Sequence, residues 1–281
     1  MDSGSKKISA CLVVYNEEKV IRQCLNSIKD LVDEIIVVHD GECFDKTLEI
    51  VKEYTDNIFT REHVGIAEPH RTFALLQASG DWILQIDGDE YLDKVDHVRI
   101  REIVANCPSG VDGYIFKWEM WNGRRAIQLK GIQKMCLFRK KNFGFQGIPQ
   151  EAGHVKGKVM KVDIYIHHRP LYNNVSWRHF WRKAKKWVPI HAKYYFPELV
   201  RYECFNTSVD CWLNYANRVT AHPLLYLIFY PLKTSLAQFR NGLWSSWVGI
   251  NLVGQMYVYY FCLHWQILII KIKVNFQSWF L

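Results

Sequence analysis

Four consecutive residues, Asp87-Gly88-Asp89-Glu90, have the types and the spacing of a site for a hard divalent cation. They follow the apolar run Trp82–Ile86, a pattern typical of a short buried strand. Carboxylate oxygens are the ligands that Mg²⁺ prefers, and it usually shares them with substrate phosphates. Gly88 can adopt backbone angles closed to other residues and could let a ligand approach the chain closely. Alone, such a motif is more often an acidic surface turn. The surrounding elements therefore decide between a cation site and a surface turn.

Alternating strand and helix patterns precede this motif. Strand patterns at Ile8–Val14, Glu34–Val38 and Ile58–Phe59 alternate with helical patterns at about 20–28, 45–54 and 68–78. Asn16 is a good N-cap for the first helix. This alternation predicts an α/β fold with a parallel sheet covered by helices on both faces. Ligands bind beyond the carboxyl ends of such strands, where Asn16, Asp40 and Asp87 all fall.

Five segments carry a resemblance to a known family: Ala10–Glu18, Asp33–Gly41, Arg71–Trp82, Asp87–Glu90 and, more weakly, Phe145–Glu151. In this order they resemble family 2 glycosyltransferases, which have the nucleotide-sugar-binding GT-A fold. The nearest branch includes the lipopolysaccharide-core β-glucosyltransferases. The resemblance covers about residues 7–170. It implies a Rossmann-like GT-A catalytic domain over residues 1–170 and leaves residues 171–281 as a helical, membrane-associating and acceptor region.

Three positions depart from the family pattern. His39-Asp40-Gly41 stands where the family usually has Asp-Ser-Gly or Asp-Gly-Ser, Thr72 replaces an Asn after Arg71, and Gln150 replaces a His before Glu151. None of these departures removes a carboxylate. The resemblance therefore still implies the core chemistry, whereas the choice of donor or acceptor can differ.

The resemblance assigns roles to particular residues. A nucleotide sugar, with UDP as the default nucleotide, would be bound by Tyr15, Asn16, Glu17, Asp40, Arg71 and Asp87. Mg²⁺ or Mn²⁺ would be held by Asp89 with help from Asp87 and would stabilise the charge that develops on the leaving diphosphate. His167, preferred here over His168, would complete the coordination at the end of the strand Val162–Ile166. For Arg71, a surface salt bridge is an equally good reading.

Glu151 is the candidate general base, because a neutral acceptor hydroxyl is a poor nucleophile. One base opposite a leaving diphosphate implies a single in-line displacement, so the anomeric configuration should invert. A polyprenyl phosphate acceptor would need no base and stays open as an alternative. A different class of protein, a non-catalytic binding or scaffolding protein on a membrane, also stays possible as an alternative.

The cysteines and the N-terminal residues indicate the cellular compartment in which the protein works. The eight cysteines have no C-x-x-C spacing, which argues against zinc and redox sites, and free thiols indicate a reducing compartment. Residues 1–7 lack the apolar core of a signal peptide. We therefore expect an enzyme at the cytoplasmic face of a membrane, peripheral or monotopic.

The net charge of +8 is unevenly placed, since residues 164–281 contain 13 Lys and Arg but three acids. A basic region suits nucleic acid, but the tryptophans of the amphipathic pattern at 177–193 favour a membrane with anionic lipids, and we expect no nucleic-acid partner. A core-packed helix is the alternative there. Leu243–Ile270 has no charged residue. It predicts in-plane attachment, with a spanning helix or a homo-oligomer interface as alternatives.

Overall fold

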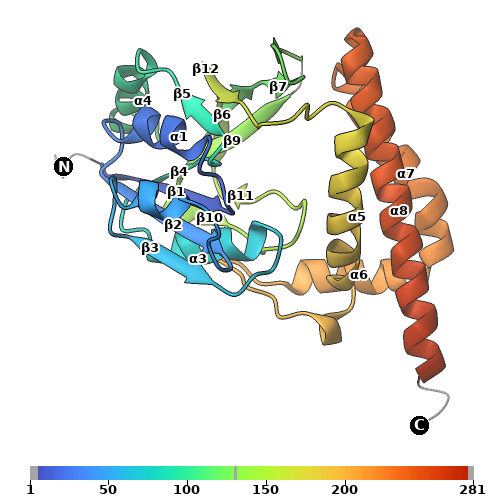
Figure 1. The fold of residues 1–281 in the computed structure, drawn as a ribbon. Helices are drawn as coiled ribbons and strands as arrows, with labels where there is room; N and C mark the ends of the chain where they lie inside the picture. Colours follow the sequence, from blue (N-terminus) through green and yellow to red (C-terminus); the bar gives the residue numbers. More distant parts are fainter. Residues whose placement is uncertain (1–5, 130–131, 278–281) are drawn as a thin grey trace.

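The computed structural model describes residues 6–129 and 132–277 of the 281-residue chain, and Figure 1 shows an α/β domain beside a layer of C-terminal helices. The main sheet has the strand order β3-β2-β1-β4-β9-β6-β12-β5. Its first four strands are parallel: β1 (Ile8–Val14), β2 (Glu34–Asp40), β3 (Ile58–Arg61) and β4 (Trp82–Gln85). The expected α/β class and its parallel strands are confirmed.

The second half of the sheet is mixed rather than parallel. Strand β9 (Gln133–Arg139) runs antiparallel between β4 and β6 (Val111–Trp118), β12 (Lys158–His168) is parallel to β6, and β5 (Glu90–Leu92) closes the edge antiparallel to β12. Two small antiparallel pairs complete the domain: β7 (Met120–Trp121) with β8 (Ala126–Ile127), and β10 (Phe143–Gly144) with β11 (His154–Val155).

Side-chain alternation along the strands builds a core on each face of the sheet. On one face, Leu12 of β1 lies in a buried cluster with Ile21 and Leu25 of α1 (Ile21–Ile28). On the other face, Cys11 packs in a cluster with Leu75 of α3 (Glu68–Gln77). Helices α2 (Thr47–Val51) and α4 (Asp96–Ala105) complete the α/β domain.

The predicted capping of the first helix by Asn16 is wrong. Helix α1 begins at Ile21 with Val20 as its N-cap residue, and residues 17–20 form a turn before it. Asn16 has a left-handed backbone, with a φ of 51°, and its side-chain oxygen accepts a hydrogen bond from the Phe44 N–H at 2.8 Å. Asparagine tolerates this conformation better than most residues. It therefore ties the end of β1 to the loop after β2.

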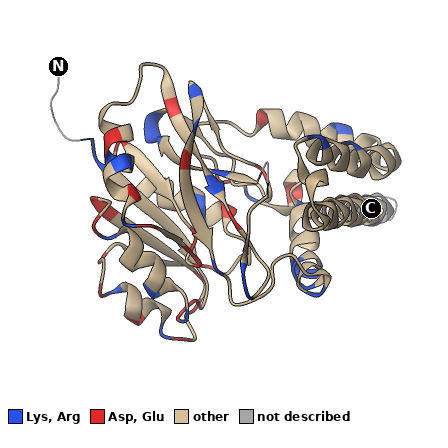
Figure 2. Ribbon diagram, turned by 90° about the horizontal axis from the view of Figure 1, so that it is seen from above, with Lys and Arg blue, Asp and Glu red and all other residues tan. Residues whose placement is uncertain are grey.

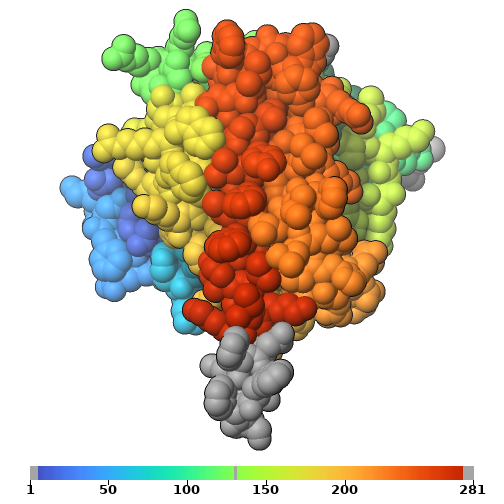
Figure 3. Space-filling view, turned by 90° about the vertical axis from the view of Figure 1, so that its right-hand side faces the viewer, coloured from blue at the N-terminus to red at the C-terminus, as the bar shows by residue number. Residues whose placement is uncertain are grey.

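Four helices form the C-terminal layer: α5 (Trp177–Lys193), α6 (Asp210–Ala221), α7 (Pro223–Arg240) and α8 (Trp247–Gln277). Helix α8 lies between α5 and α7, as Figure 3 shows from the outer side. Short 3₁₀ turns lie at Lys140–Asn142, Pro197–Leu199 and Leu243–Ser245. None of the helices in the described part of the chain is long and apolar enough to cross a bilayer.

The chain returns to the α/β domain between α5 and α6. Phe205 pairs with Phe145 through two backbone hydrogen bonds and lies in the core cluster beside α3. Glu203 accepts a hydrogen bond from Arg61 of β3 at 2.7 Å. The helical layer is thus anchored to the sheet beyond residue 170, and the predicted division there stays a prediction.

Candidate active site

The carboxylate of Asp87, directly after β4, is held by two cations. Arg71 of α3 donates to Oδ1 at 2.7 Å, and Lys134 of β9 donates to Oδ2 at 2.9 Å. Burial alone would raise the pKa of Asp87, but the charges of Arg71 and Lys134 outweigh it and hold that pKa far below its usual range. Arg71 therefore forms a salt bridge with an acid of the D-x-D motif, and its contact with donor phosphates stays a prediction.

Glu90 lies beneath the motif and is fully buried. Its carboxylate accepts hydrogen bonds from Lys134 Nζ at 2.6 Å and Trp118 Nε1 at 2.6 Å, and from the Asp87 N–H at 2.9 Å. Burial raises the pKa of Glu90 against the opposing charge of Lys134. Glu90 is thus the internal support that orients Asp87, with Lys134 bridging the two acids.

His168, not the preferred His167, lies beside Asp89. Its Nε2 is 3.3 Å from Asp89 Oδ2. His167 points to the other side of β12 and contacts Glu119 at 2.8 Å and Asp93 at 2.9 Å. Successive residues of a strand face opposite sides of the sheet, so only one histidine of the pair can reach the motif. The choice of His167 was wrong for this geometric reason.

The hydrogen bonds of Asn174 determine the tautomer of the neutral His168 ring. Asn174 Oδ1 accepts from the Trp121 N–H at 2.8 Å, so its Nδ2 faces His168 Nδ1, at 2.9 Å. An amide NH₂ only donates. His168 Nδ1 must then be the acceptor, and the neutral ring carries its proton on Nε2, the nitrogen that faces Asp89.

A third carboxylate, Glu17, approaches the motif from the turn after β1. Its Oε2 is buried without a hydrogen-bond partner among the described residues. Burial, together with the nearby charges of Asp89 and Asp87, raises the pKa of Glu17 well above its usual value. A Cβ added to Gly88 would stand 1.9 Å from this oxygen. Gly88 is therefore required for space, because its backbone is not among the left-handed glycines.

Asp40, at the end of β2, organises the loop that follows β3. Its oxygens accept hydrogen bonds from the Val64 N–H at 2.7 Å and the Gly65 N–H at 2.9 Å, and His70 Nε2 lies 2.8 Å from Oδ1. The loop thereby sets His63 against the half-exposed ring of Tyr15, with ring centroids 4.9 Å apart. In this arrangement Asp40 shapes the predicted nucleoside pocket.

Two lysines of α5 lie on the side of the helix next to the α/β domain, Lys183 partly buried and Lys186 exposed. Lys186 Nζ lies 5.6 Å from the centre of the Tyr15 ring. Lys183 Nζ lies 5.1 Å and 5.0 Å from the ring centres of Tyr172 and Trp187, and it makes no salt bridge with the described residues. Burial lowers the pKa of Lys183, against the opposing influence of Asp89 and Asp87. An uncompensated lysine beside the D-x-D motif is suited to an anionic ligand.

Glu151 lies in the loop after β10, where Gly147 and Gln150 both have a positive φ. Its N–H donates to the Ile148 carbonyl at 3.2 Å, and the Gln150 N–H donates to Glu68 at 3.2 Å. Although its side chain is exposed, the surrounding protein raises the pKa of Glu151 by desolvation. Burial of Tyr260, and after it the nearby Tyr230 and Glu151, raises the pKa of Tyr260 to about 12. Glu151 therefore faces the junction of the two layers.

Lys134 and Lys183 were missed in the sequence. Lys134 had a signal in the sequence, because it directly precedes the apolar strand run Met135–Phe138, and its side chain is only 16% exposed. A lysine at a core strand position implies a buried acid as partner. Figure 2 shows that the acidic residues lie mainly in the α/β domain, so Lys183 on the nearly acid-free helical layer has its counter-charges across the junction.

Comparisons with known proteins agree with the motifs. The chain is 32% identical to an uncharacterized glycosyltransferase of Rickettsia typhi over 49% of this chain and 44% of that protein. It is 33% identical to the glycosyltransferase SunS of Bacillus subtilis over 36% of this chain and 24% of that protein. The chain thus spans less than half of the curated relatives that it matches.

Two solved structures show a more distant likeness. Staphylococcus aureus TarS has a TM-score of 0.44 at 15% identity over 90% of each chain. Glucosyl-3-phosphoglycerate synthase of Mycobacterium tuberculosis has a TM-score of 0.42 at 18% identity, over 59% of this chain and 72% of that chain. The family model described as glycosyl transferase family 2 matches residues 9–165. Because this match covers more than half of the chain, the protein belongs to glycosyl transferase family 2.

Proposed function

We propose that the protein is a metal-dependent, inverting glycosyltransferase that transfers a sugar from a UDP-sugar to a hydroxyl of a lipid-linked or envelope glycan. One observation carries this proposal: Asp87 and Asp89 directly follow β4, and the carboxylate of Glu17, from the turn after β1, lies against Gly88 between them. Acidic oxygens gathered there suit a cation that is shared with substrate phosphates.

The donor set fits Mg²⁺ or Mn²⁺. The described residues include no group of three His, Cys, Asp or Glu placed to hold a metal ion by themselves. Mg²⁺ is usually bound by one or two carboxylates and completes its shell with water and phosphate oxygens. Asp89 is our first ligand, because Arg71 and Lys134 already occupy both oxygens of Asp87. The unpartnered Oε2 of Glu17 is a further oxygen that a cation would satisfy.

A cation bound by Asp89 would stabilise the negative charge of the departing diphosphate. The chain's own residues supply the rest. Lys183 presents a further positive charge on the opposite wall, and the Arg71–Asp87–Lys134 arrangement keeps Asp87 ionised and fixed. Tyr15, with Lys186 and His63 around it, provides a flat surface for the nucleoside. These contacts bind and orient the donor before any bond breaks.

Glu151 is the base that we propose for the acceptor hydroxyl. A carboxylate is most effective as a general base when its pKa lies near the working pH, and desolvation raises the pKa of Glu151 in that direction. Proton abstraction from the side opposite the diphosphate gives one in-line displacement. An α-linked donor should then yield a β-linked product.

The outer face of the helical layer supports attachment to a membrane surface with anionic lipids. Helix α7 exposes large apolar side chains, among them Phe229 (59%) and Leu232 (49%). No Asp or Glu occurs after Asp210, whereas Arg218, Lys233 and Arg240 border this face. Apolar burial and attraction to anionic lipid act together on such a surface. We therefore place the enzyme at the cytoplasmic face of a membrane.

The test is transfer from UDP-sugars in the presence of Mn²⁺, with product configuration read from the anomeric proton coupling by NMR. The proposal expects inversion, and Glu151→Gln should lower turnover by about 10²–10⁴-fold while UDP still binds. Retention of configuration would contradict the mechanism. Undiminished transfer by a folded Glu151→Gln variant would favour the phosphate acceptor.

A further inference from the structure

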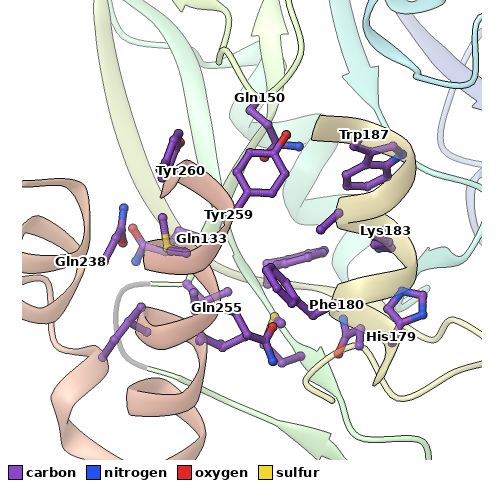
Figure 4. A pocket seen from close by; sticks show the side chains of 18 residues that line it. Gln133, Gln150, His179, Phe180, Lys183, Trp187, Gln238, Gln255, Tyr259 and Tyr260 are labelled. Carbon is purple, nitrogen blue, oxygen red and sulfur yellow. The ribbon is translucent and has the colours of Figure 1, made fainter. Parts of the chain in front are cut away.

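A cavity of about 500 Å³ lies between the sheet and helices α5 and α8, on the acceptor side of the candidate active site. Its volume is within the range of about 300–1,000 Å³ that is typical of small-molecule sites. Trp118 and Gln150 contribute from the α/β domain, Phe180, Lys183 and Trp187 from α5, and Tyr259 and Tyr260 from α8 (Figure 4). The cavity is therefore built by both layers of the protein.

The lining of this cavity combines aromatic faces with amide side chains. In Figure 4, Gln150, Gln238 and Gln255 approach the space from different sides, with the ring of Phe180 between them and α5. The amides of Gln150 and Gln238 make no side-chain hydrogen bond within the described residues, whereas Gln255 Nε2 donates to the Val175 carbonyl at 3.0 Å. An amide both donates and accepts hydrogen bonds, as a sugar hydroxyl does. Aromatic faces match the apolar C–H face of a sugar ring.

Charge is nearly absent from the lining. No Asp or Glu among the described residues lines the cavity, and desolvation lowers the pKa of the lining His179 to about 4, so this ring is neutral. Among the described residues that line the cavity, Lys183 is the one charged side chain, and its Nζ lies over the rings of Tyr172 and Trp187. An anion placed deep in the cavity would lose its water without gaining a counter-charge, which is costly. The lining therefore favours a neutral, hydroxyl-bearing ligand.

The cavity also joins the two ends of the proposed reaction. Trp118, which lines it, donates from Nε1 to Glu90 beneath the D-x-D motif at 2.6 Å. At the other end, Gln150, which lines the cavity, directly precedes Glu151 in the chain. A ligand here would lie between the donor's leaving group and the proposed base.

We propose that this cavity binds a neutral sugar residue of the acceptor, stacked on Phe180 and held through its hydroxyls by Gln238 and Gln150. This inference rests on the proposed function and narrows it. The unit that accepts the new linkage is an uncharged sugar, and any lipid or phosphate portion of the acceptor lies outside the cavity.

The test uses saturation-transfer NMR with methyl β-glucoside, methyl β-galactoside and methyl β-N-acetylglucosaminide as neutral probes, and farnesyl phosphate as an anionic, apolar probe. At least one glycoside should bind the full-length protein. Phe180→Ala should weaken that binding about tenfold, because it removes a buried aromatic contact. Gln238→Ala should weaken it severalfold. The matched controls are Trp181→Ala, the exposed aromatic next along α5, and Gln77→Ala on the surface of α3.

Three outcomes overturn the inference: no glycoside binds, binding is equal in Phe180→Ala and Trp181→Ala, or farnesyl phosphate binds through Phe180 and displaces the glycosides. Binding of UDP with Mn²⁺ is measured on the same samples. If UDP binds and the glycosides do not, the cavity inference alone fails. If UDP also fails to bind, the proposed function fails with it.

Discussion

Lys134 Nζ lies 2.9 Å from Asp87 Oδ2 and 2.6 Å from Glu90 Oε2, so one lysine neutralises two acids at the base of the D-x-D motif. The antiparallel strand β9 carries Lys134, and it lies beside β4, which ends at the motif. The position of the proposed metal-binding edge therefore depends on a strand that comes almost fifty residues later in the chain.

Replacing Lys134 by Met should destabilise the fold and shift the pH dependence of donor binding. Removing one partner of a buried ion pair costs about 3–5 kcal/mol. Asp87 has a depressed pKa in the folded state, so the stability it contributes is present above its unfolded pKa and is lost as the pH falls through the folded pKa. Without Lys134 the folded pKa of Asp87 rises, so the acid limb of UDP binding should move to higher pH. Calorimetry between pH 4 and 8 measures this.

The control for that experiment is Lys141→Met, because Lys141 is exposed and distant from the acids in sequence and contacts. An unchanged pH profile in a folded Lys134→Met variant would show that Lys134 does not set the ionisation of Asp87.

Glu17→Gln should raise thermal stability at pH 7 while weakening metal-dependent UDP binding. The pKa of Glu17 is raised in the folded state, so its ionisation lowers stability as the pH rises from the unfolded pKa toward the folded one. A neutral Gln avoids the cost of ionisation at this buried position, so the Tm should rise by a few degrees. Scanning calorimetry at pH 5 and 7 should show the larger gain at pH 7. The exposed Glu42→Gln is the control, and an equal gain there would refute the explanation.

Gly88→Ala should disrupt the site although Gly88 has an ordinary backbone. The added methyl would meet Glu17 Oε2 at 1.9 Å and Ile21 Cδ1 at 3.2 Å. Overpacking of this kind costs about 1–3 kcal/mol. Combining it with Glu17→Ala should recover most of the lost stability, since the clashing side chain is gone. Denaturant unfolding of both variants tests this, and no recovery in the double variant would place the strain in the backbone instead.

The exposed face of α7 should bind anionic liposomes. Basic residues near such a surface contribute about 1 kcal/mol each, so changing Arg218, Lys233 and Arg240 together to Gln should weaken binding by about 10²-fold. The control changes Lys29, Lys52 and Lys161, exposed residues of the α/β domain, to Gln. It removes the same number of positive charges and should have little effect on liposome binding. Sedimentation with anionic and neutral vesicles gives the comparison. If the protein binds neither kind of vesicle and sediments as an oligomer, the membrane proposal is contradicted, and this face is instead an interface between copies of the chain.

Much of the fold follows from local pattern. The strands Ile8–Val14 and Glu34–Asp40 and the helix Glu68–Gln77 match their apolar periodicities, and these place Asp40 and Asp87 at one edge. Local patterns of this kind do not predict which strands far apart in the sequence pair in the sheet. The insertion of β9 beside β4 depends on residues far apart in the sequence, and with it comes the contact between Lys134 and Asp87.

The candidate site, like the fold, is only partly predictable from local sequence. The sequence pattern leads us to prefer His167, whereas the register of β12 against β5, which pairs His168 with Glu90, brings His168 to the motif. The basic helix at 177–193 was predicted, but a helical pattern does not reveal that Lys183 and Lys186 turn toward the α/β domain. The face of a helix that meets a partner is fixed by tertiary packing.

The most direct test of a metal-dependent nucleotide-sugar site is calorimetric titration of UDP into the full-length protein with Mn²⁺ or with EDTA. The measurement is repeated on Asp89→Asn and on Asp93→Asn, an exposed aspartate outside the acidic cluster. We predict UDP binding that requires Mn²⁺, is weakened by about 10²-fold or more in Asp89→Asn and is unchanged in Asp93→Asn. Equal UDP affinity in EDTA, or in a folded Asp89→Asn variant, would contradict the account.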